Sequence, residues 1–383
     1  MFMHFLALQI AISYILRISS FRYTNFHYKL INKYSYLFTP TNLFRNGKLF
    51  ANENEKISNV GHKEKKLYLL SPRGFCEGVN RAINIVNECL RILPPPIYVK
   101  HEIVHNEIVC NALRAKGAIF VDHLEQVPEG AVLIFSAHGV SPAIRQQANS
   151  LKLVTIDASC PLVNKVHVYV KLKASEGYKI VLIGHKNHVE TIGTYGEAPE
   201  ATTVVETVGD VQNLNYTESD KLFYVTQTTL SLDDCKDICN ALKKRYPYIE
   251  TIPSGSICYA TTNRQTAVQQ ISPLVDLVIV VGSQMSSNAN RLIDTCTRRN
   301  VRGVLINSIE QLKEINMSNC LNIAVTSSAS TPDAITQSVV DILTAEPHNY
   351  KLELYNAVEE RIPKWKFPKN LQDMIKNSQI QSL

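Results

Sequence analysis

Short apolar runs, many of them rich in β-branched residues, recur along the chain and alternate with stretches of helical periodicity. Fully apolar strands joined by helices are typical of parallel sheets that are covered on both faces. The pattern therefore predicts an α/β fold. The predicted strands are Lys66–Leu70, Ile97–Val99, Ala118–Val121, Val132–Phe135, Ile180–Ile183, Thr203–Val205, Leu222–Val225, Leu277–Val281, Gly303–Ile306 and Ile323–Val325.

Three of the predicted helices open with a cysteine, which indicates an internal repeat. The three segments read Cys76-Glu-Gly-Val-Asn-Arg, Cys160-Pro-Leu-Val-Asn-Lys and Cys258-Tyr-Ala-Thr-Thr-Asn-Arg. Each helix leads into an apolar strand that ends in a polar loop, at residues 101–105, 185–188 and 283–288. A second polar strand end follows in each segment, at residues 136–139, 226–229 and 326–330. The sequence therefore predicts three copies of one α/β unit.

The repeat also sets the predicted domain boundaries. The three units span residues 65–160, 161–256 and 257–345, and a C-terminal extension follows at residues 346–383. Ligand sites of parallel α/β sheets form beyond the carboxyl ends of the strands, which is where the polar loops lie. Three units around a pseudo-threefold axis would therefore direct their cysteines and polar loops to one centre.

The positive charge of the chain is confined to its first residues. The net charge is +6 at pH 7, and residues 1–52 contain basic residues but no acidic one. The rest of the chain is balanced, with 34 basic and 34 acidic residues. Nucleic-acid binding requires a basic face or stripe. A nucleic-acid partner is therefore not expected, and any anionic ligand must be bound by a local site.

Residues 1–64 are predicted to be a targeting leader that lies outside the fold. The apolar run Phe5–Leu16 is short for a transmembrane helix but has the length of a signal-peptide core. The stretch Arg17–Lys48 is basic, lacks acidic residues and is typical of a transit peptide. This two-part leader predicts delivery to a secondary plastid of the apicoplast type, without stable membrane insertion of the mature protein. A mitochondrial presequence and a disordered tail without targeting information are the alternatives.

The nine cysteines are widely spaced and form no CxxC pair, so neither a disulfide scaffold nor a zinc ribbon is indicated. Cys76, Cys160 and Cys258 differ from the others because they occupy the same place in the three units. The start of a helix favours the thiolate, which is the form that binds metal. Three thiolates without a fourth ligand fit an iron–sulfur cluster with one open iron. A zinc site with an open position and three ordinary core cysteines are the alternatives.

Histidines and small polar residues at the strand ends form a second candidate site. The chain has no GxxxxGK[ST] phosphate-binding loop. The candidates are His105, His138, His188, Ser286, Ser287, Asn288 and Ser330. Together they offer directional hydrogen-bond donors suited to a diphosphate, with charge assistance where a histidine is protonated. Separate capping roles at the starts of loops are the alternative.

Glu190 and Thr228 are candidates for proton transfer. Glu190 lies two residues beyond His188, and a carboxyl group close to cofactor and substrate can donate a proton if burial raises its pKa. Thr228 lies at a predicted strand end, where its hydroxyl could relay a proton or position a water. An exposed surface position is the alternative for Glu190.

The ordered motifs resemble one known family. They read Ser71-Pro-Arg-Gly-Phe-Cys76-Glu-Gly-Val-Asn-Arg-Ala, His101-Glu-Ile-Val-His105-Asn, Phe135-Ser-Ala-His138-Gly-Val, Asp157-Ala-Ser-Cys160-Pro-Leu-Val, Thr226-Gln-Thr-Thr-Leu-Ser231, Ile257-Cys258-Tyr-Ala-Thr-Thr-Asn-Arg-Gln265 and Ser286-Ser-Asn-Ala-Asn-Arg291. This set is similar to the 4-hydroxy-3-methylbut-2-enyl diphosphate reductases, the IspH or LytB family. The resemblance runs from about Leu67 to about Phe367.

The resemblance implies a trefoil of three α/β units around a [4Fe–4S] cluster with one open iron. Cys76, Cys160 and Cys258 would bind this cluster, Glu190 would supply protons, and Thr228 would lie beside the substrate hydroxyl. The histidines, serines and asparagine named above would hold the diphosphate. The implied reaction is the reductive dehydroxylation of 4-hydroxy-3-methylbut-2-enyl diphosphate to isopentenyl and dimethylallyl diphosphate. It is the last step of the methylerythritol phosphate (non-mevalonate) pathway, and ferredoxin is the implied electron donor.

Two other functions would use the same type of cofactor. In an iron–sulfur hydro-lyase the open iron only polarises a hydroxyl group, and no reductant is required. An iron–sulfur carrier or sensor would have no substrate and therefore no use for the diphosphate-binding residues.

The chain departs from the pattern of the family at two places. The segment His188-Val-Glu190-Thr-Ile-Gly193 stands where His-Pro-Glu-Val-Glu-Gly is usual, so a proline and a second acid are missing. Ser328-Ala-Ser330 stands where Gly-Ala-Ser is usual. A side chain at residue 328 crowds the backbone if glycine's conformational freedom is needed there. We expect a local adjustment at both places.

Overall fold

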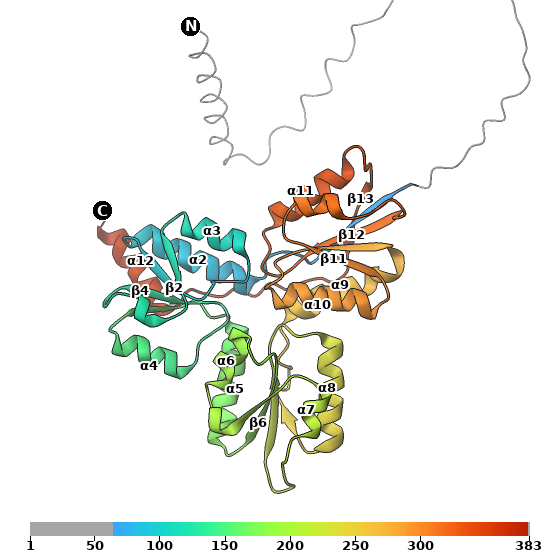
Figure 1. Ribbon diagram of the computed structural model, residues 1–383. Coiled ribbons are helices and arrows are strands. Elements are labelled where there is room, and N and C mark those ends of the chain that lie inside the picture. The colour runs from blue at the N-terminus through green and yellow to red at the C-terminus, as the bar shows by residue number, and fades with distance from the viewer. Residues whose placement is uncertain (1–63, 382–383) are drawn as a thin grey trace, which may run out of the picture. The chain divides into compact units, whose positions relative to one another are not determined.

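The computed structural model describes residues 64–381. The predicted leader, residues 1–64, lies outside the described residues except for its last position. The described residues form three parallel sheets with helices on their faces, and the sheets surround a common centre (Figure 1). This arrangement confirms the predicted α/β fold with three units.

The three sheets are assembled mostly from strands that are neighbours in the sequence. The first contains β2 (Ile97–Lys100), β3 (Ala118–Val121), β4 (Val132–Phe135) and β5 (Val154–Asp157). The second contains β6 (Lys179–Ile183), β7 (Thr202–Val205), β8 (Leu222–Thr226) and β9 (Glu250–Thr251). The third contains β10 (Leu277–Val281), β11 (Arg302–Ile306), β12 (Asn322–Ser327), β1 (Lys66–Ser71) and β13 (Lys351–Asn356).

The order of the strands shows that the three sheets are equivalent. It is β3-β2-β4-β5 in the first, β7-β6-β8-β9 in the second and β11-β10-β12-β1-β13 in the third, and every pairing is parallel. The fourth strand of each sheet leads to one of the three cysteines, because β5 precedes Cys160, β9 precedes Cys258 and β1 precedes Cys76. The first described strand of the chain therefore completes the third sheet and closes the repeat into a ring.

This closure differs from the predicted boundaries in two places. β1 was assigned to the first unit, residues 65–160, but it pairs with β12 and β13 of the third sheet. The predicted C-terminal extension, residues 346–383, contains a further strand of that sheet, β13, and the helix α12 (Lys369–Gln381). A repeat that closes on itself must take one element from the far end of the chain, and a linear division of the sequence does not reveal this.

Helices connect the strands, and three of them pass from one sheet to the next. These are α2 (Glu77–Ile92), α5 (Pro161–Ser175) and α9 (Tyr259–Ile271), and their N-caps are Cys76, Cys160 and Cys258. The others are α3 (Glu107–Arg114), α4 (Pro142–Ser150), α6 (Val189–Tyr195), α7 (Val208–Gln212), α8 (Leu232–Arg245), α10 (Ser287–Arg298) and α11 (Asp333–Thr344). Short 3₁₀ turns lie at residues 124–126, 199–201, 272–274 and 310–314. In the part of the chain that the structure describes, none of the helices combines the length and hydropathy needed to cross a bilayer.

All ten predicted strands are confirmed, whereas β5, β9 and β13 were not predicted. The three strands that were not predicted share a physical feature. Each lies at an edge of its sheet and buries little apolar surface. β9 has only two residues, and the first residue of β5, Val154, is exposed. β13 is an edge strand whose residues alternate between exposed and half-buried positions.

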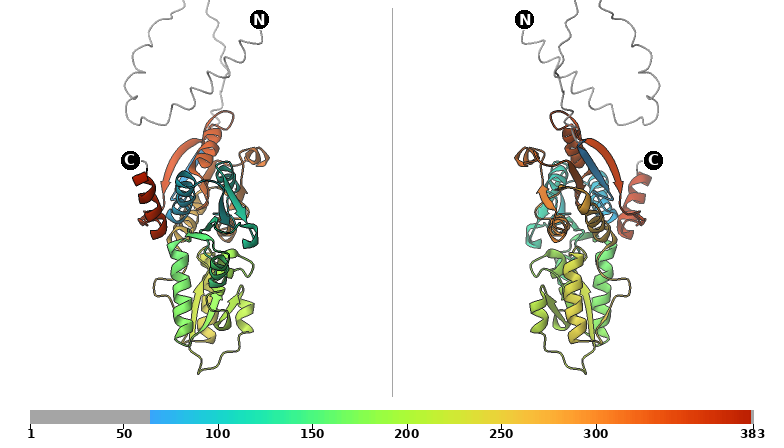
Figure 2. Two further views of the ribbon diagram at one scale, coloured as in Figure 1. Left: turned by 90° about the vertical axis from the view of Figure 1, so that its left-hand side faces the viewer. Right: turned by 90° about the vertical axis from the view of Figure 1, so that its right-hand side faces the viewer.

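The C-terminal helix α12 packs against α2 of the first unit (Figure 2). Leu371 is fully buried in the core that α2 and the first sheet share, and Phe367, Met374 and Ile375 pack around it. The C-terminal segment therefore crosses from the third sheet, which it completes as β13, to the first unit. It joins two parts of the structure that are far apart in the sequence.

Leu371→Ala is expected to destabilise the protein by about 2–5 kcal/mol, because it removes a buried side chain and leaves a cavity. Urea unfolding of the variant and the wild type measures the difference. Ile380→Ala in the same helix is the matched control, since Ile380 is 70% exposed and its removal should change the unfolding free energy by less than about 0.5 kcal/mol. Equal effects of the two substitutions would show that α12 does not contribute to the core.

Candidate active site at the centre of the three units

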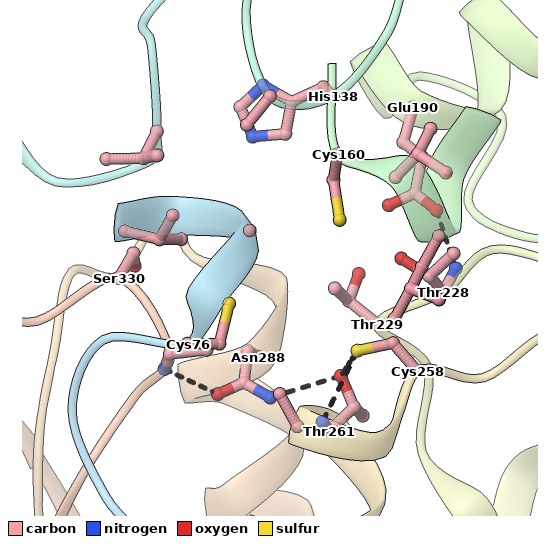
Figure 3. Close-up of a pocket in the computed structure, with 18 of the residues that line it drawn as sticks. Cys76, His138, Cys160, Glu190, Thr228, Thr229, Cys258, Thr261, Asn288 and Ser330 are labelled. Carbon is pink, nitrogen blue, oxygen red and sulfur yellow. Dashed lines mark hydrogen bonds between the residues drawn. The ribbon is translucent and has the colours of Figure 1, made fainter. Parts of the chain in front are cut away.

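One cavity lies where the carboxyl ends of the strands and the starts of the cysteine helices meet (Figure 3). It collects all twelve candidate site residues from the three units. They are Cys76, His105, His138, Cys160, His188, Glu190, Thr228, Cys258, Ser286, Ser287, Asn288 and Ser330. The predicted convergence on one centre is thus observed.

The three cysteines occupy equivalent positions in this cavity. Each is the N-cap of its helix, and its sulfur points into the shared space (Figure 3). Each cysteine N–H also donates a hydrogen bond to a carbonyl just beyond the neighbouring strand. The N···O distances are 3.1 Å from Cys76 to Ala329, 2.9 Å from Cys160 to Ala137 and 3.0 Å from Cys258 to Thr228. The acceptors are at or beside candidate substrate-binding residues, so every cysteine is tied to the polar loop that follows the neighbouring strand of the same sheet.

The protonation state of the cysteines differs from the expectation for a helix start. Burial raises the pKa of Cys76, that of Cys160 to about 12 and that of Cys258 to about 11. The helix N–H groups of Gly78 and Val79 lower the pKa of Cys76, but burial has the larger effect. In the ligand-free protein the thiols are therefore protonated at neutral pH. Metal binding must displace these protons.

The donor set fits an iron–sulfur cluster. Three thiols converge on one cavity, and all nine cysteines of the chain are free. Among residues 64–381, no group of three histidine, cysteine, aspartate or glutamate side chains is arranged to hold one metal ion. A cluster makes a different demand, because its thiolate ligands bind separate irons. The remaining six cysteines do not line the cavity.

Gly78 keeps the space between two of the sulfurs clear. A Cβ at this position would lie 2.7 Å from Sγ of Cys160 and 3.8 Å from Sγ of Cys76. The first distance is shorter than carbon–sulfur contacts allow, so glycine is required for the close approach of α2 to Cys160.

Three histidines form one wall of the cavity. The ring centroids of His105 and His138 are 4.2 Å apart and the rings are stacked, while His188 lies 5.4 Å from His105 and 6.1 Å from His138. The Nδ1 atoms are engaged within the protein, because His138 pairs with Ser136 Oγ at 3.2 Å and His188 accepts from the Glu190 N–H at 3.1 Å. The Nε2 atoms of His105 and His188 are buried and have no partner. These two unpaired atoms are available to a ligand in the cavity.

The histidines are neutral in the ligand-free protein at pH 7. Burial lowers the pKa of His105, and burial together with the two neighbouring histidines lowers the pKa of His138 far below its ordinary value. Burial and the charge of His105 lower the pKa of His188 to about 4. The charge assistance expected from protonated histidines therefore requires a bound anion to favour their protonated form.

Small polar side chains form the opposite wall. Ser286 is the N-cap of α10, and Asn288 Oδ1 accepts from the Ala329 N–H at 2.9 Å. The Ser330 hydroxyl lies 3.3 Å from the carbonyl of His105, and the Ser287 hydroxyl lies 3.1 Å from the carbonyl of Thr229. These contacts join the start of α10 to loops of all three units. The groups are therefore held at fixed positions around the cavity.

Glu190 is buried, with only 3% of its surface exposed. Its Oε1 accepts a hydrogen bond of 2.6 Å from the Thr228 N–H, and its own N–H donates to Nδ1 of His188, the N-cap of α6. Burial raises the pKa of Glu190, against the opposing effect of the Thr228 hydrogen bonds. The predicted pair of Glu190 and Thr228 is thus in direct contact, and the carboxyl group has the environment that a proton donor needs.

Both departures from the pattern of the family are accommodated. Ile192, which replaces the second acid, is 54% exposed and does not line the cavity. Ser328 does not have a positive φ, and its hydroxyl lies 2.9 Å from the Thr331 hydroxyl. A Cβ at Gly282 would come within 3.0 Å of Ser328 Oγ, so the absence of a side chain at residue 282 gives Ser328 its room. The structure therefore has room for the side chains of Ile192 and Ser328.

Several residues that line the cavity were not predicted. They are Gly78, Val79, Val104, Ala137, Leu162, Val163, Thr229, Tyr259, Ala260, Thr261, Ala329 and Trp365. Most of them are neighbours of predicted residues. Trp365 is different, because it belongs to the C-terminal segment, far from the three repeats in sequence. Two features of the sequence point to Trp365. It is the only tryptophan of the chain, and it lies at the end of the region of resemblance.

The fold and the site define a class of trefoil α/β proteins in which three helix-capping cysteines share a polar cavity at the centre. The sequence model of the LytB protein family matches residues 67–344. The chain therefore belongs to the LytB family.

Relatives with assigned names are similar over most of the described residues. A Plasmodium falciparum (isolate 3D7) protein named 4-hydroxy-3-methylbut-2-enyl diphosphate reductase, apicoplast, is 58% identical over 323 residues. The alignment covers 84% of this chain but 60% of that protein, so this chain spans less than two thirds of its length. A 4-hydroxy-3-methylbut-2-enyl diphosphate reductase of Protochlamydia amoebophila (strain UWE25) is 55% identical over 278 residues, which is 73% of this chain and 89% of that protein.

Solved structures agree with these relatives. The E-1-hydroxy-2-methyl-but-2-enyl-4-diphosphate reductase of Plasmodium falciparum matches with a TM-score of 0.82 and 57% identity, over 82% of this chain and 99% of that chain. A second structure, of an (E)-4-hydroxy-3-methyl-but-2-enyl diphosphate reductase, matches with a TM-score of 0.54 and 31% identity, over 73% of this chain and 99% of that chain. The fold predicted from the resemblance is thus confirmed.

Gly78→Ala is expected to destabilise the protein by about 1–3 kcal/mol, because the added methyl group displaces Cys160. Gly209→Ala is a closely matched control. Gly209 is also the second residue of its helix, and its Cβ would make only an ordinary contact of 3.5 Å. The control should be neutral or stabilising by up to about 1 kcal/mol. Urea unfolding measures both, and a neutral Gly78→Ala would show that Cys160 has room to move.

Proposed function

We propose that this protein reduces 4-hydroxy-3-methylbut-2-enyl diphosphate to isopentenyl diphosphate and dimethylallyl diphosphate, the terminal reaction of the non-mevalonate pathway. The observation that carries the proposal is the cavity, in which three helix-capping cysteines face a wall of histidines and a wall of small hydroxyl and amide groups. The names of the relatives support the same reaction. The chain provides both a site for a redox cofactor and a site for an anion.

Cys76, Cys160 and Cys258 would hold a [4Fe–4S] cluster with one open iron. The helix N-cap positions and the bonded backbone N–H groups fix the three sulfurs before the cofactor binds. When bound, the cluster would supply electrons and a Lewis-acidic iron next to the substrate. Burial of the thiols restricts the access of water to this site.

The diphosphate would lie between the histidine wall and the start of α10. The Nε2 atoms of His105 and His188 are buried and have no partner, which is costly unless a ligand pairs with them. His188 would donate from Nε2, because its Nδ1 accepts a hydrogen bond, whereas His105, whose Nδ1 faces the Glu102 carboxylate, would donate from Nε2 once it is protonated. His138, Ser286, Ser287, Asn288 and Ser330 would add donors around the same space. Because the histidines come from two units and the hydroxyl groups from the third, the anion would contact all three units.

Glu190 would deliver protons to the reacting carbon skeleton. Its buried carboxyl group holds a proton to a higher pH than an exposed one, and it lines the same cavity as the cysteines. The Thr228 N–H fixes one carboxyl oxygen at 2.6 Å, which leaves the other oxygen to carry the proton. Thr228 would place its hydroxyl beside the substrate hydroxyl and guide it as it leaves as water.

A plastid location and a ferredoxin electron donor complete the proposal. The Plasmodium falciparum relative is named as an apicoplast protein, which supports a plastid-type location for this chain. The signal-like run followed by a basic, acid-free stretch supports the same destination. Ferredoxin is the donor that the family resemblance implies for a plastid enzyme.

The reaction is tested with the full chain purified without oxygen and reconstituted with iron and sulfide. Turnover of 4-hydroxy-3-methylbut-2-enyl diphosphate should require a reductant. Glu190→Gln should lower kcat by about 10²–10⁴-fold, the range for loss of a proton donor, with the cluster still bound. Cys76→Ser should abolish turnover together with the iron–sulfur absorption. Cys320→Ser, at a buried cysteine outside the cavity, is the control that should retain both.

Each competing function has its own outcome in this assay. Turnover without a reductant would indicate a hydro-lyase. An intact cluster without any turnover, and with no effect of His105→Ala, would indicate a carrier or sensor. Failure of the wild type to retain iron would overturn the cluster assignment.

Diphosphate binding should take up protons. The histidines have lowered pKa values in the free protein, and a bound anion raises them, so the complex holds more protons than the free protein. The affinity for inorganic diphosphate is therefore expected to fall as the pH rises from about 5 to 8, by up to tenfold per unit for each proton. Calorimetry in buffers of different ionisation enthalpy measures the uptake. His188→Gln should reduce it, and the control His348→Gln, which is outside the cavity, should not.

A pH-independent affinity would contradict this assignment, because it would place the diphosphate away from the three histidines. Equal uptake in His188→Gln and His348→Gln would have the same meaning.

A further inference from the structure

Each cysteine helix carries a basic side chain that reaches toward the next cysteine. Arg81 lies on α2, Lys165 on α5 and Arg264 on α9, five or six residues after the cysteine that caps the helix. Each donates to a backbone carbonyl shortly before the cysteine of the next unit. The distances are 3.0 Å from Arg81 to Ser159, 3.3 Å from Lys165 to Gly255 and 2.7 Å from Arg264 to Gly74.

These three contacts form a closed ring. Ser159 precedes Cys160 directly, Gly255 lies three residues before Cys258 and Gly74 lies two residues before Cys76. The direction is the same in every case, from the helix of one cysteine to the backbone before the next. The contacts of Arg81 and Arg264 are buried and that of Lys165 is exposed, but all three connect the same parts of the repeat. They repeat because the three units repeat.

We infer that Arg81, Lys165 and Arg264 are positioning residues that fix the three cysteines relative to one another. The iron measurement in the test below rests on the proposed function, whereas the positioning of the cysteines does not. Each cysteine is thereby fixed from two sides, by its own N–H bond to the neighbouring strand end and by the basic side chain that grips the backbone just before it. The relative positions of the cysteines are thus set by the protein and do not depend on the cofactor.

The chemistry of the contacts supports this role. Arg264 is fully buried and Arg81 nearly so, and a hydrogen bond from a charged donor to a carbonyl is stronger than one from a neutral donor. The three contacts therefore hold the backbone in front of each cysteine in a fixed position.

Each of the three basic side chains has an additional contact. Lys165 Nζ donates to Ser254 Oγ at 2.6 Å. Arg81 Nε donates to the carbonyl of Lys366 at 3.0 Å, and Arg264 pairs with Glu360 at 3.1 Å. The partners of the two arginines lie on either side of Trp365 in sequence, so the arginines also hold the segment that brings the tryptophan to the cavity.

Lys165 offers the sharpest test, because it is half-buried and its replacement is compatible with folding, whereas loss of a fully buried arginine can unfold the protein. In the full chain reconstituted with iron and sulfide, Lys165→Met should increase amide hydrogen exchange about tenfold in the peptide that contains Cys258. Exchange in the peptide that contains Cys76 should stay unchanged. Iron loss to a chelator should be accelerated by a similar factor, and Lys165→Arg should restore both values.

Arg245→Met is the matched control. Arg245 also donates to two backbone carbonyls, of Gln212 and Leu214, but both belong to its own unit and lie away from the cysteines. This variant should leave exchange at the cysteine peptides and iron loss as in the wild type. Lys165→Met values equal to those of Arg245→Met would overturn the inference, as would equal increases at all three cysteines. Because amide exchange needs neither substrate nor turnover, an inactive wild type would leave this test intact.

Discussion

The hydrogen bond from each cysteine N–H to the carbonyl beyond a neighbouring strand is the constraint on which the rest of the structure depends. It holds a helix start and its sulfur against one of the polar loops that line the cavity. In each sheet, the strand that leads to the cysteine lies next to the strand that carries the second polar loop, as β5 lies next to β4. Parallel pairing puts both strand ends at the same edge. The geometry of the site is therefore a direct consequence of the strand order.

Repeating this arrangement three times creates a closure problem, which the ends of the chain solve. The third sheet needs a strand that leads to the first cysteine, and only β1, at the start of the described residues, can supply it. The C-terminal segment then continues past β13 and packs α12 on the first unit. The three units are consequently not independent domains. Each cysteine depends on two units, and removal of either end of the fold would affect the centre.

Periodicity and repeat spacing were sufficient to predict most of the strands and all twelve candidate site residues, because both are local signals. The apolar runs are buried on both faces, as in β10, and the cysteine of each unit recurs before the same pattern of helix and strand. The membership of β1 in the third sheet is not local and was missed for that reason. Gly78 was missed because its role depends on a sulfur 82 residues away in sequence, and Trp365 because its segment belongs to no repeat.

Burial controls the charge of the groups at the centre. It raises the pKa of the cysteine thiols and of Glu190 and lowers the pKa of the three histidines, so it favours the neutral form of every one of these groups. A buried group that is neutral avoids the large cost of a buried, unpaired charge. Under the proposed function, thiolates and protonated histidines would arise together with the metal and the anion that compensate their charge. The exposed position of Ile192 is consistent with this principle, because an acid there would lie at the surface and would not add a charge to the cavity.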